Sequence, residues 1–235
     1  MIEKRNLAER ERDTERYILS TFPVLYLPLW KLDGASFLSR DGHGHLCTVT
    51  GATWGSQGRT FNGVDDKLDI PANSAFSNHS QFTLLIWLKM GALEAAVKTP
   101  FQTGEAATYR IVFNVNQKDD GSNLAGAIRF HVRTTGDVVL AGGTTTGVLD
   151  TTNFTHLALK YDQVNVSLYK DLQLLKTVAG TAAMTGADPA AAYIGSSGGS
   201  AQFIPGIIGE LFYYNRALTP QEVQHNFIQT RWRYQ

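Results

Sequence analysis

The stretch Tyr193–Val223, YIGSSGGSAQFIPGIIGELFYYNRALTPQEV, is the most informative part of this 235-residue chain. Its apolar run Ile207–Tyr214 follows a Gly/Ser turn and predicts a strand. A helix start comes next. Thr219 can cap the helix, Pro220 occupies the first helical position, where its missing N–H costs nothing, and Glu222 can complete a capping box. The stretch therefore predicts a closing strand followed directly by a capped helix.

From Thr21 onward the pattern is that of an all-β domain. Short apolar or alternating runs are separated by turns such as Asp33-Gly34 and Asp120-Gly121, which indicates a sandwich or jelly roll. Trp87 and Tyr169 lie within such runs, and we expect them to be core residues on opposed sheets. The predicted strands are Val24–Trp30, Lys67–Ile70, Phe82–Met90, Tyr109–Val115, Ala127–Val132, Val138–Leu140, Thr155–Tyr161, Val164–Tyr169 and Leu174–Val178.

Five segments, taken in order, resemble the laminin-G-like and concanavalin-A-like lectin/glucanase jelly rolls. The resemblance implies an all-β, two-sheet antiparallel jelly-roll sandwich that binds rather than catalyses. We expect a charged N-terminal arm at residues 1–20, and a single jelly roll with its short C-terminal helix and tail at residues 21–235. The matching segments are Leu25–Gly34, Thr48–Pro71, Gln81–Met90, Phe154–Leu175 and Tyr193–Val223.

One departure from this family bears on metal binding. Gly209 stands where the family usually has an aspartate before Glu210, in a region that helps to hold calcium in some relatives. A calcium ion held by oxygens from distant loops, with Asn62 and Glu210 as ligands, is one alternative, and the absence of any cofactor is the other. The pair His43 and His45 has no third ligand near it in sequence, so we expect no transition metal there.

The acidic residues argue against glycoside hydrolysis. Retaining hydrolysis needs two carboxyl groups close together, and alternate residues of a strand share a face, so a catalytic strand would carry two acids two positions apart. No glutamate beyond the arm has an aspartate two positions later. The sequence therefore predicts that the protein is not an enzyme. These glutamates are Glu94, Glu105, Glu210 and Glu222.

Composition excludes two further classes of function. The chain carries 21 basic and 21 acidic residues, so it has no positive excess to neutralise phosphates, and nucleic-acid binding is not expected. No apolar run approaches the ~20 residues needed to span a bilayer, so membrane insertion is not expected. Cys47 is the single cysteine, and its apolar neighbours predict a small buried side chain rather than a reactive thiol.

The N-terminal arm differs in kind from the rest. Five acidic and five basic residues lie between Glu3 and Arg16, some of them at helical spacings. Such pairs do not hold a short isolated helix. The arm is either solvated or ordered by packing on another chain, and in the second case Arg5, Leu7 and Arg12 are candidate partner contacts.

The C-terminal tail is short, basic and aromatic. Arg231, Trp232, Arg233 and Tyr234 follow the last predicted helix, and these residue types are enriched at protein interfaces. We therefore expect an exposed anchor for a partner protein. Trp54, in contrast, is expected to pack.

Two functions are compatible with these features. The first is a phage or virus particle component, for example a capsid decoration or appendage protein that binds other virion proteins and is oligomeric or assembly-bound. The N-terminus lacks the apolar core of a secretory signal, which favours this virion location, with an extracellular location as the alternative. The second function is a free-standing carbohydrate-binding module that holds glycans through loop Asn and Asp side chains and an aromatic platform.

Overall fold

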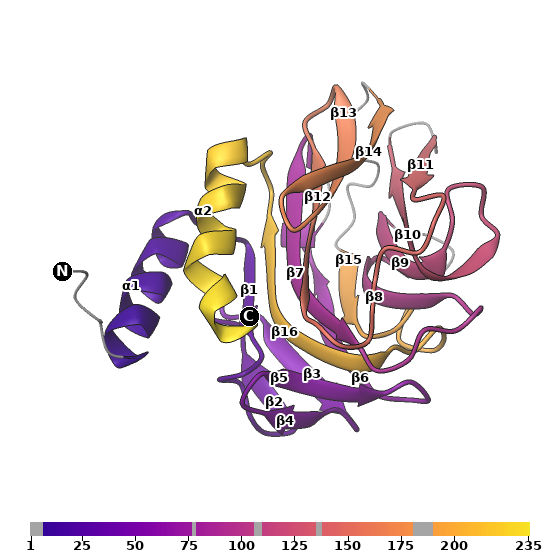
Figure 1. The fold of residues 1–235 in the computed structure, drawn as a ribbon. Helices are drawn as coiled ribbons and strands as arrows, with labels where there is room; N and C mark the ends of the chain where they lie inside the picture. Colours follow the sequence, from indigo (N-terminus) through magenta and orange to yellow (C-terminus); the bar gives the residue numbers. More distant parts are fainter. Residues whose placement is uncertain (1–6, 77–78, 106–109, 135–137, 181–189) are drawn as a thin grey trace.

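The computed structural model describes residues 7–76, 79–105, 110–134, 138–180 and 190–235. Within these residues the chain forms two antiparallel sheets of eight strands each, with the helices on one side (Figure 1). Sheet A has the order β14 (Gln173–Ala179), β13 (Asn165–Lys170), β12 (Thr155–Tyr161), β7 (Phe82–Met90), β16 (Pro205–Tyr214), β5 (Gly58–Asn62) and β4 (Thr53–Gly55), and β1 (Leu25–Pro28) also pairs with β16.

Sheet B faces sheet A across the core. Its strand order is β11 (Val139–Gly143), β10 (Asn123–Arg133), β9 (Ile111–Gln117), β8 (Lys98–Thr103), β15 (Ala190–Ile194), β6 (Lys67–Asn73), β3 (Leu46–Thr50) and β2 (Ser36–Leu38). The remaining elements are α1 (Leu7–Ser20), η1 (Ser74–Phe76), α2 (Pro220–Thr230) and η2 (Arg231–Arg233). The predicted antiparallel sandwich with a C-terminal helix is confirmed. No helix in the described ranges combines the length and apolar character needed to cross a membrane.

Strand β7 is buried on both of its faces. Leu84, Ile86 and Leu88 point into the core between the sheets, whereas Leu85 and Trp87 belong to clusters on the outer face of sheet A. The helices cover that outer face, because Val223 and Phe227 of α2 join the same clusters. Trp87 is fully buried, as expected.

Tyr169 does not lie where it was predicted. It is partly buried, and its strand β13 belongs to sheet A together with β7. The expectation that Trp87 and Tyr169 occupy opposed sheets is therefore wrong. Both side chains point outward from sheet A toward the helical layer.

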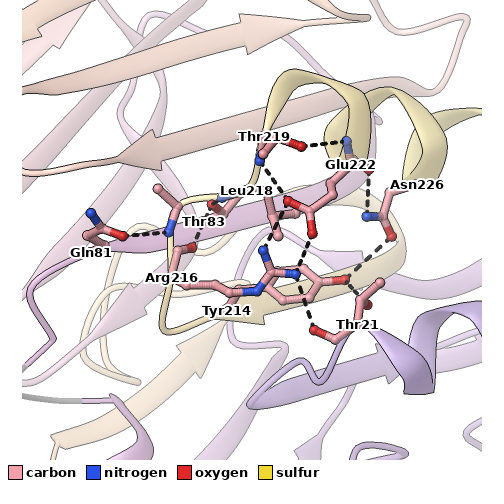
Figure 2. Close-up of polar contacts among 10 residues, drawn as sticks. Thr21, Gln81, Thr83, Tyr214, Arg216, Leu218, Thr219, Glu222 and Asn226 are labelled. Atoms are coloured by element: carbon pink, nitrogen blue, oxygen red, sulfur yellow. Dashed lines mark hydrogen bonds and ion pairs between the residues drawn. The ribbon is translucent and has the colours of Figure 1, made fainter.

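Helix α2 begins with the predicted capping box, shown in Figure 2. The Glu222 backbone N–H donates to Thr219 Oγ1 at 3.2 Å, and the Thr219 N–H donates to Glu222 Oε2 at 2.8 Å. Arg216 adds two hydrogen bonds to the Glu222 carboxylate, of 2.7 and 3.0 Å. Thr83 of β7 accepts from the Leu218 N–H at 2.9 Å, so the cap is joined directly to sheet A.

The segment after residue 6 is helical and contacts its own chain. The Tyr17 ring of α1 lies 3.9 Å from the His225 ring of α2, measured between centroids, and Glu11 lies 3.9 Å from Lys31. Just after α1, Thr21 Oγ1 lies 3.1 Å from the Tyr214 hydroxyl (Figure 2). The alternative of a fully solvated arm is therefore wrong for Leu7–Ser20, because tertiary contacts stabilise a helix that its local charge pairs alone would not.

The capping cluster predicts a specific sensitivity to acid. Hydrogen bonds from Arg216 lower the pKa of Glu222 from 4.5 to about 2. Because the folded-state pKa lies below the unfolded one, this contribution is present above pH 4.5 and is lost as the pH falls toward 2. Solvent screens these partly exposed side chains, so Glu222→Gln should cost about 1 kcal/mol at neutral pH and almost nothing at the acid end. Urea unfolding across this range measures the difference. Glu94→Gln is the control, because Glu94 is itself more exposed than Glu222 and lies 3.6 Å from its partner Lys98; equal pH profiles for the two variants would contradict the prediction.

Candidate functional site

The predicted calcium ligand Glu210 lies at a bulge in β16. The pairs Ile208↔Leu88 and Leu211↔Ile86 leave two residues, Gly209 and Glu210, opposite the one residue between Ile86 and Leu88. The Glu210 side chain is fully buried on the outer side of sheet A.

One oxygen of the Glu210 carboxylate already accepts hydrogen bonds from the same chain. Its Oε1 accepts a hydrogen bond of 2.6 Å from Trp30 Nε1 and one of 2.8 Å from Arg233 Nη1. Burial raises the pKa of Glu210, and the Arg233 charge opposes that rise. A guanidinium thus supplies the positive charge that a calcium ion would have brought.

The second predicted calcium ligand, Asn62, belongs to a separate turn. Its Oδ1 accepts from the Val64 N–H at 2.8 Å, and its Nδ2 donates to Asp65 Oδ1 at 2.8 Å. Asn62 pairs with Pro205, five residues before Glu210 on β16, which is roughly 15 Å along the strand. A calcium site shared by Asn62 and Glu210 is therefore wrong. The described residues contain no group of three His, Cys, Asp or Glu side chains able to hold a metal.

The C-terminal tail folds back onto sheet A. Tyr234 is buried and stacks on Trp87 with 4.7 Å between ring centroids, and the Arg233 guanidinium lies 3.5 Å from the centroid of the Trp30 ring. Arg231 is exposed and Trp232 is half-buried. The prediction of an exposed anchor is therefore wrong for Arg233 and Tyr234.

Gly209 explains why the tail can dock. A Cβ atom built at Gly209 would overlap the ring of Tyr234, and an aromatic ring held by stacking has little freedom to move away. The family's usual aspartate would exclude Tyr234 from this place. The substitution of glycine for that aspartate was the one signal in the sequence for internal docking of the tail.

The three candidate contacts in the arm are not brought into a site by the structure. Arg5 lies outside the described residues, Leu7 begins α1, and Arg12 is exposed on that helix. Their role as partner contacts stays a prediction.

A hollow with convergent polar groups lies instead on the outer face of sheet B. The helices lie against the other sheet, sheet A, as Figure 1 shows. The strand registers place Gln102, Tyr193, Asp69 and Thr48 side by side across β8, β15, β6 and β3. We call this the Tyr193 hollow. Its volume is about 360 Å³, and it is lined by Thr48, Lys67, Asp69, Ile70, Pro71, Ala191, Tyr193, Gly198 and Gly199.

Hydrogen bonds orient the side chains of this hollow. Lys67 Nζ contacts Asp69 Oδ2 and the carbonyl oxygen of Gly199, each at 2.9 Å. The Tyr193 hydroxyl donates to Glu105 Oε1 at 2.5 Å. Asp69 Oδ1 is buried and accepts no hydrogen bond from any described residue. Gly199 has a φ of +69° and approaches the Tyr193 ring so closely that a Cβ atom would lie 3.1 Å from Cε1.

The chemistry of the Tyr193 hollow is that of binding. Burial, and then the hydrogen bond and charge of Glu105, raise the pKa of Tyr193, so its hydroxyl stays protonated and acts as a donor. One cation, one carboxylate and one half-buried aromatic ring line the hollow, and a second carboxylate, Glu105, lies at the Tyr193 hydroxyl. Together they provide donors, acceptors and an apolar surface within a small volume. This combination suits a polar ring-shaped ligand that carries several hydroxyl groups.

A second hollow beside α2 has a different character. Its volume is about 280 Å³, and its one charged lining residue, Lys160, is already paired with Asp162 at 3.2 Å. Leu172, Leu218 and Val223 supply an apolar lining. These three residues belong to the cluster that packs α2 against sheet A, so the packing of the helix explains this hollow.

Comparisons with known proteins agree with the fold. The chain is similar to the Trypanosoma rangeli sialidase in complex with sialic acid, with a TM-score of 0.68 and 17% identity over 95% of this chain and 38% of that chain. It is similar to the binding domain of botulinum neurotoxin serotype G, with a TM-score of 0.67 and 12% identity over 88% of this chain and 51% of that one. This chain thus spans well under two thirds of either protein.

A third structure matches over nearly its whole length. It is domain 4 of AbnA, an extracellular arabinanase from Geobacillus stearothermophilus, in complex with arabinotriose, with a TM-score of 0.65 and 19% identity over 87% of this chain and 97% of that one. No curated protein matches the sequence. The family model of the concanavalin A-like lectin/glucanases superfamily matches residues 62–224, which is more than half of the chain. The chain therefore belongs to the concanavalin A-like lectin/glucanases superfamily.

Proposed function

We propose that the protein is a non-catalytic carbohydrate-binding module that holds a sugar in the Tyr193 hollow. The observation that carries this proposal is the convergence of Tyr193, Lys67, Asp69 and Glu105 on the sheet face away from the helices. The fold supports it, because similar structures include a sialidase with sialic acid and an arabinanase domain with arabinotriose.

The geometry of the hollow meets two needs of sugar binding. The Tyr193 ring is held at its hydroxyl end by Glu105 and flanked by Gly199, so its orientation is set before a ligand arrives. An oriented ring costs little entropy when an apolar sugar face packs on it. The Asp69 carboxylate is the candidate acceptor for a sugar hydroxyl, because it lines the hollow and its Oδ1 has no donor from the described residues.

The carboxylates of the hollow are arranged as acceptors. Glycoside hydrolysis needs one carboxyl group that carries a proton to the leaving group. Asp69 accepts from Lys67, and Glu105 accepts from Tyr193. Elsewhere Glu210 contacts Arg233 and Glu222 contacts Arg216. These contacts support a role in binding rather than hydrolysis.

Removing the aromatic ring tests the proposal. Tyr193→Ala should weaken glycan binding about tenfold or more, which corresponds to about 1.4 kcal/mol. Asp69→Asn should weaken it as well, because the amide loses the charge that pairs with Lys67. Binding is measured by screening the wild-type protein on a glycan array and then titrating the bound glycan by calorimetry. Phe22→Ala is the matched control, because it removes an aromatic ring that is 79% exposed elsewhere on the surface.

Three outcomes would count against the proposal. Absence of binding to every glycan on the array would overturn it. Equal affinities for Tyr193→Ala and the Phe22→Ala control would remove the Tyr193 hollow as the site. Reducing sugar released during the same incubations by the wild-type protein would contradict the non-catalytic part.

The virion role stays a prediction from the sequence. One part of it was docking through both ends of the chain, and Arg233 and Tyr234 are buried against sheet A. Of the candidate contacts in the arm, Arg12 of α1 is exposed. A mass-spectrometric inventory of purified particles tests it.

A further inference from the structure

Strand β10 places basic side chains in a row on the outer face of sheet B. The residues of this strand that face the core between the sheets include Ile128, Phe130 and Val132. Successive side chains of a strand point to opposite faces, so Arg129, His131 and Arg133 point outward. Alternate residues of a strand lie roughly 7 Å apart, so these three positions extend over roughly 13 Å.

Arg110 adds a fourth basic side chain from the neighbouring strand. It directly precedes β9, and its carbonyl oxygen accepts a hydrogen bond of 2.9 Å from the Arg133 N–H. The next residue, Ile111, faces the core, so Arg110 faces outward beside Arg133. Like charges at such positions repel each other, and an anion between them offsets the repulsion. We call Arg110, Arg129, His131 and Arg133 the basic row.

Two guanidinium groups of the basic row have no acidic partner among the described residues. Arg110 and Arg129 are partly buried, neither forms an ion pair with a described carboxylate, and the Nε atom of each has no hydrogen-bond partner there. Burial, and then the charge of Arg129, lower the pKa of His131 to about 4, so this imidazole is neutral at neutral pH. The arginines therefore carry the positive charge of the basic row.

The hairpin between β9 and β10 positions Arg129 and uses its own carboxylates elsewhere. A Cβ atom built at Gly121 would overlap Nη1 of Arg129, so the guanidinium lies directly against the hairpin backbone. The carboxylates of the hairpin contact lysines, Asp119 with Lys176 at 2.6 Å and Asp120 with Lys118 at 3.2 Å. These contacts leave the Arg129 charge available to a ligand.

The surroundings of the basic row favour a chain of acidic sugars over a nucleic acid. A planar guanidinium can hold an oxyanion through two parallel hydrogen bonds. Binding of single-stranded nucleic acid also uses aromatic rings on which the bases stack. Phe113 and Phe130 of these strands face the core. Trp54, which is 47% exposed although the sequence predicted that it packs, belongs to sheet A. The chain has a net charge of +0, so it has no general attraction to phosphates.

We propose that the basic row is a second binding surface, which takes an acidic polysaccharide through the carboxylate or sulfate groups along its chain. The surface is separate from the Tyr193 hollow, because β8 lies between β9 and β15 in the strand order of sheet B. The proposal goes beyond the proposed function, since the basic row needs neither the hollow nor its ligand in order to hold an anionic chain.

Matched pairs of charged and neutral polysaccharides test this proposal. The probes are polygalacturonate with its neutral methyl ester, and dextran sulfate with dextran, each titrated by calorimetry. We expect the wild-type protein to bind at least one charged member about tenfold or more tightly than its neutral counterpart. Because three arginines contact the chain, that affinity should fall roughly tenfold between about 50 and 200 mM salt.

Variants locate the binding surface. Arg110→Gln and Arg129→Gln should each weaken binding of the charged polysaccharide about fivefold, which corresponds to about 1 kcal/mol. Arg129→Lys keeps the charge and should lose less, so a general folding defect is separated from the loss of charge. Arg40→Gln is the matched control, because Arg40 is exposed and follows β2 at the opposite end of sheet B. Tyr193→Ala should leave this affinity unchanged.

Four results would overturn the second surface. The first is equal affinity for the charged and neutral members of both pairs. The second is equal affinity of Arg129→Gln and Arg40→Gln for the charged polysaccharide, and the third is loss of that binding in Tyr193→Ala. The fourth is a single-stranded oligonucleotide that binds as tightly as the polysaccharide and is weakened equally by Arg129→Gln, which would identify a nucleic acid as the partner. The proposed function is tested separately, by the glycan array and Tyr193→Ala.

Discussion

Replacing Arg233 with methionine is expected to lower the free energy of unfolding by about 3–5 kcal/mol, the range found when one partner of a buried ion pair is removed. The two side chains are almost inaccessible, with 6% of Arg233 and none of Glu210 exposed. Methionine fills much of the same volume but leaves the Glu210 carboxylate buried without its cation. The hydrogen bonds from Trp30 and, at 3.5 Å, from the Tyr26 hydroxyl would remain, and they do not compensate a buried charge.

The control is Arg231→Met, two positions earlier, where the side chain is exposed. Chemical denaturation of both variants at neutral pH measures the contrast. The loss in Arg233→Met should shrink as the pH falls through the raised pKa of Glu210, because protonation then removes the unpaired charge. Adding Glu210→Gln to Arg233→Met should recover part of the stability. Equal midpoints for Arg233→Met and Arg231→Met would contradict this account.

Local patterns in the sequence were sufficient for the central elements. Strands β7 and β12 have the predicted bounds, and the capping box of α2 forms as its residues indicated. These features depend on interactions within a few residues. Strand β8 was not predicted, because Pro100 lies inside it, and proline normally marks an edge or a break. The structure accommodates Pro100 at an irregularity in the pairing of β8 with β9, which no local pattern reveals.

The burial of Trp87 was predictable, but the face of the sheet from which its side chain projects was not. Alternation between apolar and polar residues normally shows which face of a strand is buried. In β7 the run FTLLIWLKM is apolar on both faces, because α2 covers the outer side as the second sheet covers the inner side. The pattern therefore indicated burial without showing against which layer.

The candidate site could not be assembled from the sequence for a topological reason. Tyr193 and Asp69 are adjacent because β15 pairs with β6, and these strands are far apart along the chain. Glu105 comes from the loop after β8, on the other side of β15. Each residue alone resembles an ordinary surface position. Only the strand order of sheet B brings them together.

For the C-terminal tail, the sequence likewise did not show which surface its residues contact. Its Arg and aromatic residues do make close contacts, but these contacts are with the same chain, at Trp87 of sheet A and at Trp30. Composition indicates that such residues bind something, and it does not indicate what. The bulge at Gly209 and Glu210 decides the partner, because it provides both the space for Tyr234 and the charge for Arg233.

Replacing Trp87 with alanine is expected to cost about 3–5 kcal/mol, as for other fully buried large aromatic residues. The indole stacks on Tyr234 and Phe227 with centroid distances of 4.7 and 5.5 Å, and its Nε1 donates to Thr230 Oγ1 at 2.8 Å. It therefore connects sheet A to both α2 and the tail. Trp87→Phe keeps most of the apolar volume and should cost roughly 1–2 kcal/mol, for the lost hydrogen bond and the smaller ring.

The position of Trp87 in the helical layer gives this prediction a second readout. If Trp87 belonged to the core between the sheets, its removal would destabilise the whole sandwich evenly. Because it faces α2 and the tail, Trp87→Ala should first release Tyr234, so carboxypeptidase should trim the variant faster than the wild-type protein at temperatures where both are folded. Leu174→Ala is the control, since that side chain is 53% exposed and lies on β14, at the end of sheet A remote from β16. An unchanged denaturation midpoint, or trimming no faster than in Leu174→Ala, would contradict the assignment of Trp87 to the outer face of sheet A.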